Sequence, residues 1–176
     1  MSKPEFVYMT VIAAPPDRVW QGLTTAEFTE QYWHSTRIRS AFTPGAAIEF
    51  QNPDGSVGVA GEVLTADRPR ELSYTWRFLR NPDAVGDPAS RVTFTLEAIR
   101  PGTRLTVTHD RLAEGSATAT MVTFGWPHVI AGLKTLLETG TAVDFTAPEE
   151  PGCPGRQGAA SASAGRDDPA PATQPR

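Results

Sequence analysis

GWPHVIAGLKTLLETG, residues 125–140, predicts a long amphipathic helix near the end of the chain. Its apolar side chains recur at spacings of three and four residues, which places them on one face of an α-helix. They are Trp126, Val129, Ile130, Leu133, Leu136 and Leu137. Gly140 follows as a C-cap, and Pro127 either marks the first turn or kinks a longer helix that starts near Thr118. Such an apolar stripe has to be buried against another element.

Upstream of this helix the hydrophobic period changes to two, which predicts β-strands. Leu72, Tyr74 and Trp76, for example, alternate with Ser73 and Thr75. Turn-forming residues separate the runs, above all NPDG at 52–55 and RPGT at 100–103. This alternation indicates an antiparallel sheet with one apolar and one solvated face. The expected strands are residues 36–40, 45–51, 57–65, 71–79, 91–99 and 103–110.

The N-terminal region predicts one further strand and two short helices. Residues 5–13 carry apolar side chains on both faces, so we expect a strand that is covered at least partly on both sides. A short helix follows the two prolines at 15–16, and a second one is expected at 26–32, with Thr24 and Glu27 as its capping box. Helices on one face of an antiparallel sheet define the α+β fold class.

The C-terminal residues 147–176 differ from the rest in composition. They contain no Leu, Ile, Val, Phe, Met, Trp or Tyr and are rich in Pro, Gly, Ala and Ser. Such a segment cannot bury enough apolar surface to offset the entropy lost on ordering. We therefore predict one domain at residues 1–146 and a disordered tail at residues 147–176.

Composition also excludes several classes of partner and compartment. The formal net charge of −4, without a clustered basic face, argues against nucleic-acid binding. The single cysteine, Cys153, lies in the predicted tail, so we expect neither an intrachain disulfide nor a cysteine-based metal site. No apolar run is long enough for a membrane span or a signal peptide. We expect a cytoplasmic protein that makes no membrane contact.

Five segments together resemble the START-like or SRPBCC superfamily, which has the helix-grip, birch-pollen-allergen-like fold. The resemblance is to the branch related to the activator of heat-shock protein 90 ATPase, and the helix segment at 125–140 is its most specific part. The glycine-rich corner common after the second strand is weaker here, where PGAA stands at 44–47. The five segments are APPDRVWQGLT from Ala14, EQYW at 30–33, GEVLTADRPRELSYTW at 61–76, GTRLTVTH at 102–109 and GWPHVIAGLKTLLETG at 125–140.

This resemblance implies a curved sheet of about six or seven strands around the C-terminal helix, with a cavity between them. Members of the superfamily hold lipids, polyketides, hormones or aromatic compounds there. We therefore expect a monomer or homodimer that binds an apolar or aromatic small molecule without a cofactor. Ordinary core packing would account equally well for the converging aromatic residues. The candidate ligand-binding residues are Trp33, Phe50, Tyr74, Trp76, Phe94, His109, Trp126, Ile130 and Leu133.

No catalytic or metal-binding motif occurs in the sequence, and we assign no catalytic residue and no metal ligand. His109 is the residue that keeps an enzymatic alternative open. Its parity with Leu105 and Val107 places it on the apolar face of the sheet, either as a hydrogen-bonded core residue or as an acid or base. The second role would suit a cyclase or hydrolase, with Tyr74 assisting. A third alternative is a protein-binding role like that of a chaperone ATPase activator.

Overall fold

The computed structural model describes residues 5–143, which contain one seven-stranded antiparallel sheet and three helices. The sheet order is β1-β7-β6-β5-β4-β3-β2, so the first strand lies beside the last. The strands are β1 (Phe6–Ile12), β2 (Arg37–Ser40), β3 (Ala47–Gln51), β4 (Val57–Asp67), β5 (Glu71–Phe78), β6 (Ser90–Ala98) and β7 (Thr103–Asp110). The helices are α1 (Pro16–Thr24), α2 (Ala26–Tyr32) and α3 (Ala117–Thr139). The predicted α+β helix-grip fold is confirmed, whereas the predicted tail lies outside the described residues.

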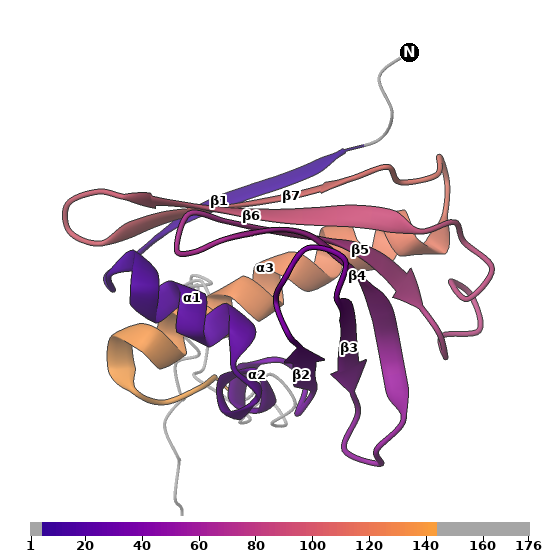
Figure 1. Ribbon diagram of the computed structural model, residues 1–176, viewed down its shortest axis with the longest axis horizontal. Helices are drawn as coiled ribbons and strands as arrows, with labels where there is room; N and C mark the ends of the chain where they lie inside the picture. Colours follow the sequence, from indigo (N-terminus) through magenta and orange to yellow (C-terminus); the bar gives the residue numbers. More distant parts are fainter. Residues whose placement is uncertain (1–4, 144–176) are drawn as a thin grey trace, which may run out of the picture. The chain divides into compact units, whose positions relative to one another are not determined.

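The sheet bends strongly along its width (Figure 1). Strands β1, β7 and β6 run across the top of the view, and β2, β3 and β4 turn downward around α3. Register shifts at Phe50/Gln51 and Val63/Thr65 mark irregular pairing on both sides of β4. Gly61 lies between them, and a Cβ atom there would stand 1.8 Å from the carbonyl oxygen of Thr75. Only glycine allows this close approach of two backbones, and such irregularities increase the local twist.

Helix α3 is the longer of the two alternatives that the sequence left open. The Ser116 side chain caps its start by accepting a hydrogen bond from the Ala119 amide at 3.1 Å. Gly140 ends it in the left-handed conformation, with φ of 79°. Pro127 therefore lies inside the helix and divides it into an N-terminal half, Ala117 to Trp126, and a C-terminal half, Pro127 to Thr139.

The C-terminal half of α3 is tightly packed between the sheet and α1. Ile130 and Leu133 are fully buried. Gly22 of α1 lies so close that an added Cβ atom would stand 2.6 Å from Leu133 Cδ1. The last turns are also tied to the first strand, because Lys134 Nζ donates to the carbonyl of Val11 at 2.6 Å. Glu138 supplements this tie, since its Oε1 atom accepts from both Lys134 Nζ at 2.6 Å and the Ala13 amide at 2.7 Å.

Two local predictions are wrong. Val7 and Met9 on the outer face of β1 are 57% and 62% exposed, so this strand is covered on one face only. The reason is that β1 forms an edge of the sheet and the helices pack on the opposite face. Thr24 does not cap α2, since its hydroxyl donates to the carbonyl of Trp20 and the N-cap position is Thr25. No helix among residues 5–143 has the length and apolar character needed to cross a bilayer.

Candidate functional site

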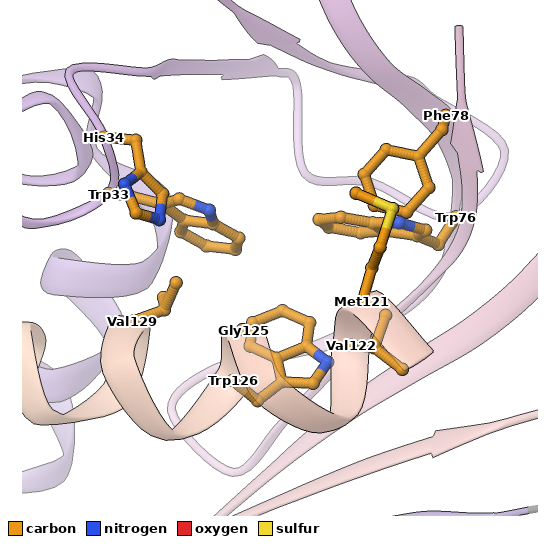
Figure 2. A pocket seen from close by; sticks show the side chains of 9 residues that line it. All are labelled: Trp33, His34, Trp76, Phe78, Met121, Val122, Gly125, Trp126 and Val129. Atoms are coloured by element: carbon orange, nitrogen blue, oxygen red, sulfur yellow. The ribbon is translucent and has the colours of Figure 1, made fainter. Parts of the chain in front are cut away.

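An open pocket of about 170 Å³ lies beside the N-terminal half of α3. Figure 2 shows Trp33 and His34 on one side of it and Trp76, Phe78 and Met121 on the other, with α3 below. The α2–β2 connection supplies the first pair, and β5 supplies Trp76 and Phe78. The lining residues are Trp33, His34, Trp76, Phe78, Met121, Val122, Gly125, Trp126 and Val129.

A second pocket of about 280 Å³ adjoins the first and extends toward β3 and β4. The two share Trp33, His34, Trp76, Phe78 and Met121, so we treat them as two lobes of one site and call it the aromatic pocket. Most of the polar side chains lie in the second lobe, whereas His34 borders both lobes. Its further residues are Thr36, Phe50, Asn52, Gly58, Val59, Arg80 and Asn81.

Aromatic rings pack against one another around this pocket. The indole planes of Trp33 and Trp76 lie within 14° of parallel, with centroids 6.2 Å apart. The Trp126 ring is 5.3 Å from the Trp33 ring and 5.6 Å from the Trp76 ring. All three residues are buried at least nine-tenths, so the surrounding structure fixes these rings in place. The walls are therefore apolar, flat and preformed, which suits a planar apolar ligand.

His109 lies below the aromatic pocket and has no exposed surface. Trp126 Nε1 donates to His109 Nδ1 at 3.0 Å, which leaves the hydrogen of the neutral ring on Nε2. That nitrogen lies 2.8 Å from Ser90 Oγ, which in turn donates to the carbonyl of Trp76 at 3.3 Å. Burial lowers the pKa of His109 to about 4, although neighbouring Asp110 acts in the opposite direction. The contacts thus hold a neutral imidazole whose two nitrogens are both engaged.

Trp76 carries an unusual polar group. Its side chain is 5% exposed, and among the described residues its Nε1 is the only buried side-chain nitrogen or oxygen without a hydrogen-bond partner. Buried polar groups in native proteins are nearly always satisfied, so such an orphan needs a physical explanation. The same ring lines both lobes of the aromatic pocket.

The predicted ligand-binding residues fall into two groups. One group lines the aromatic pocket: Trp33, Phe50, Trp76 and Trp126. The other lies in the core beneath it and borders neither lobe: Tyr74, Phe94, His109, Ile130 and Leu133. Burial also raises the pKa of the Tyr74 phenol, with a smaller contribution from Tyr32, so this group stays protonated at neutral pH. A binding role for any of the nine residues stays a prediction.

Of the α3 residues that line the pocket, the sequence predicted Trp126 as a site residue but missed Met121, Val122 and Gly125. Met121, Gly125 and Val129 are spaced four residues apart and all face it. This spacing is present in the sequence, but the predicted apolar stripe begins only at Trp126. No group of three or more His, Cys, Asp or Glu side chains that could hold a metal ion occurs among residues 5–143.

The comparisons with known proteins agree with this architecture. The protein MLL2253 from Mesorhizobium loti is 26% identical to this chain, with a TM-score of 0.65 over 76% of this chain and 96% of that one. ChR145 from Cytophaga hutchinsonii is 25% identical, with a TM-score of 0.63 over 80% and 97%. The Aha1 dimer from Colwellia psychrerythraea is 20% identical, with a TM-score of 0.63 over 78% and 98%.

A search of the curated proteins finds no match to this chain. The family model described as activator of Hsp90 ATPase homolog 1-like protein, in contrast, matches residues 13–138. That match covers well over half of the 176 residues and nearly all of the described fold. The chain therefore belongs to the family of activator of Hsp90 ATPase homolog 1-like proteins, the branch of the START-like superfamily that its sequence resembles.

Proposed function

We propose that the protein binds an apolar or aromatic small molecule in the aromatic pocket. The observation that carries this proposal is the convergence of three indole rings, those of Trp33, Trp76 and Trp126, on one open pocket. Predominantly apolar walls with a few polar groups are typical of small-molecule sites. Membership of the family adds support, because proteins with this fold commonly bind hydrophobic ligands.

The size of the pocket limits the ligand. The lobes measure about 170 and 280 Å³. Ligand sites usually span ~300–1,000 Å³, so the aromatic pocket belongs to the lower part of that range. A molecule of two or three fused rings fits this space better than a long lipid does. The near-parallel indole planes of Trp33 and Trp76 favour a flat molecule.

Gly125 offers a direct test of this site. It lines the first lobe, and a Cβ atom added there would have no neighbour within 4 Å. A larger side chain at this position, on the same helix face as Met121 and Val129, would enter the pocket without disturbing the core. We expect Gly125→Leu to fill the first lobe while keeping the fold, since leucine favours a helix more than glycine does.

The experiment is a thermal-shift screen of the full chain against aromatic metabolites and lipids. At least one compound should raise the Tm of the wild type and of the matched control Gly125→Ala, but not that of Gly125→Leu. Stabilisation that persists in a folded Gly125→Leu variant would place the ligand elsewhere. Absence of any stabilising compound in a broad panel would count against ligand binding itself.

The enzymatic alternative finds less support in the contacts of His109. Both ring nitrogens are engaged, and the rings of Trp76 and Trp126 lie 5.9 and 6.0 Å from the imidazole. A pKa of about 4 also makes the imidazole a weak base at neutral pH. Turnover of an identified substrate by the wild type, and its loss in His109→Gln, would support the enzymatic alternative.

A protein partner is the remaining alternative. The family name refers to activation of a chaperone ATPase, and one similar structure is a dimer. Stimulation of the ATPase of a cognate Hsp90 by this chain tests the first role, and sedimentation of the purified protein tests self-association. Neither outcome decides whether the aromatic pocket holds a ligand, so the two questions are separable.

A further inference from the structure

The Nε1 donor of Trp76, which has no hydrogen-bond partner, indicates that the ligand carries a hydrogen-bond acceptor. An indole N–H that is buried without an acceptor is unfavourable relative to one that is bonded, because it has lost its hydrogen bond to water. Trp126 provides the contrast within the same cluster, because its Nε1 donates to His109 at 3.0 Å. The chain satisfies one of the two neighbouring indoles and leaves the other without a partner.

No acceptor among the described residues lies within hydrogen-bonding reach of Trp76 Nε1. Its ring neighbours are aromatic, with centroids of Phe50, Phe78 and Trp126 at 5.3, 5.6 and 5.6 Å. The backbone at Trp76 is fixed by its pairing with Ser90 on β6 and by the hydrogen bond from Ser90 Oγ to its carbonyl. The indole therefore cannot swing toward a distant protein acceptor without breaking the packed cluster. The aromatic pocket, which the same residue lines, is where a partner for Nε1 would enter.

We propose that the ligand is a flat aromatic molecule with a neutral acceptor oxygen, such as a ring ketone, which accepts the hydrogen of Trp76 Nε1. This inference rests on the proposed function, since it concerns the same aromatic pocket. Trp76 is then the residue that determines specificity, while the other rings supply apolar contact. The lining of the first lobe carries no charged group apart from the ionisable His34, and Arg80 belongs to the second lobe. Burial of a carboxylate against these walls would be unfavourable, which is why the acceptor is neutral.

Contact with Nε1 requires a small rearrangement, because neighbouring atoms cover this atom. Among the residues shared by both lobes, Met121 has the most freely rotating side chain. We expect its movement to admit the ligand oxygen. The ring of Trp76 itself keeps its position.

The test uses 1-indanone and indane, which share a carbon framework and differ in one carbonyl oxygen. The chain has four tryptophans, so its ¹⁵N–¹H spectrum contains few indole signals to follow. We expect indanone to move the Trp76 indole proton downfield, and indane to leave it near its free position. The Trp126 indole, already bonded to His109, serves as the internal control. Indanone should bind about tenfold more tightly, the factor that corresponds to ~1.4 kcal/mol.

Two variants separate the hydrogen bond from the change in ring size. Trp76→Phe removes the donor, and we expect the affinity ratio of indanone to indane to fall to about one. Trp33→Phe makes the same ring change on the opposite side of the pocket and should keep the ratio. If Trp76→Phe does not fold, the indole shift in the wild type still decides the question.

The outcomes distinguish this inference from the proposed function. Equal binding of both compounds, without a specific shift of the Trp76 indole, would overturn the inference and leave the aromatic pocket as a ligand site. Failure of both compounds to bind would contradict the proposed function as well. A ratio that is lost equally in Trp33→Phe would show that ring contact, and not the Trp76 hydrogen bond, sets the preference.

Discussion

The two halves of α3 lie on the same sheet but meet it differently. Under the C-terminal half, Ile130 and Leu133 are fully buried, and Gly22 brings α1 against Leu133. Beside the N-terminal half, Met121 and Gly125 border an open pocket. A curved sheet and one helix therefore do not by themselves determine whether a cavity forms. A third element, α1, fills the space at one end, and the other end stays open.

Replacement of Leu133 should produce the largest effect and test this contrast directly. Leu133→Ala removes a fully buried side chain from the packed half and should lower the free energy of unfolding by about 3–5 kcal/mol. Met121→Ala, at the pocket wall, should cost about 1 kcal/mol or less because its side chain is already partly exposed. Urea denaturation of both variants measures the difference. Losses of equal size would mean that the two halves are packed alike.

Acidification should weaken the hydrogen bond from Trp126 Nε1 to His109 Nδ1, which lies where the two halves of α3 meet. The pKa of His109 falls from the ordinary 6.5 to about 4 on folding, so the unfolded chain binds the proton more readily between these values. The contribution of neutral His109 to the free energy of unfolding is therefore fully present above pH ~6.5. It is lost as the pH falls toward 4, by about 3 kcal/mol in total. Protonated Nδ1 can no longer accept the hydrogen of Trp126 Nε1.

Urea denaturation at several pH values between 7.5 and 4.5 checks this expectation, with His109→Gln as the control that cannot titrate. Asp110 and Glu138, whose pKa values are also lowered, contribute mainly near the acid end of this range. If the wild type and His109→Gln lose stability in parallel from pH 6.5 to 5, the histidine is not the titrating group.

Gly22→Ala should disturb the packed end. The added Cβ atom would stand 2.6 Å from Leu133 Cδ1, and Leu133 is enclosed on all sides. Overpacking typically costs 1–3 kcal/mol, partly offset by the better helix propensity of alanine, so we expect a net loss of about 1–2 kcal/mol. Guanidinium denaturation measures it. A stabilised Gly22→Ala variant would show that the contact with α1 is loose.

Gly125→Ala should have the smallest effect and the opposite sign. No neighbouring atom lies within 4 Å of the added Cβ atom, and the residue lies within α3. Removal of the entropic disadvantage of a helical glycine should stabilise the fold by about 0.5–1 kcal/mol. The same type of substitution thus acts in opposite directions where α1 packs on α3, at Gly22, and beside the aromatic pocket, at Gly125. Destabilisation of Gly125→Ala would mean that the pocket is already filled at that point.

The sequence predicted the fold well because periodicity reports directly on burial. The stripe from Trp126 to Leu137 located the helix, and parity along β7 placed His109 inside the sheet. The prediction of burial on both faces failed at β1, where Val7 and Met9 are apolar but exposed. Apolar character is not sufficient evidence of burial on an edge strand, since the neighbours that would cover it come from elsewhere in the chain.

The site was predicted only in part for the same physical reason. Trp76 follows from the alternation along its strand and Trp33 from its place at the short helices, whereas Gly125 lines the pocket without a side chain. A cavity depends on how elements distant in sequence pack against one another, so no single residue in the sequence indicates it. Similarly, nothing in the sequence distinguishes the unpaired indole of Trp76 from the paired indole of Trp126.

The pairing of β1 with β7 has a consequence for the way the chain is made. Residues from 6 to 12 lie opposite residues from 103 to 109. The end of α3 is then bonded to this strand by Lys134 and to the residue after it, Ala13, by Glu138. During synthesis, β1 leaves the ribosome almost a hundred residues before β7, its pairing partner. The sheet can close only when most of the chain exists, and contacts so distant in sequence form slowly. We therefore expect the domain to complete its folding only after α3 has been synthesised, because that helix holds the first strand in place.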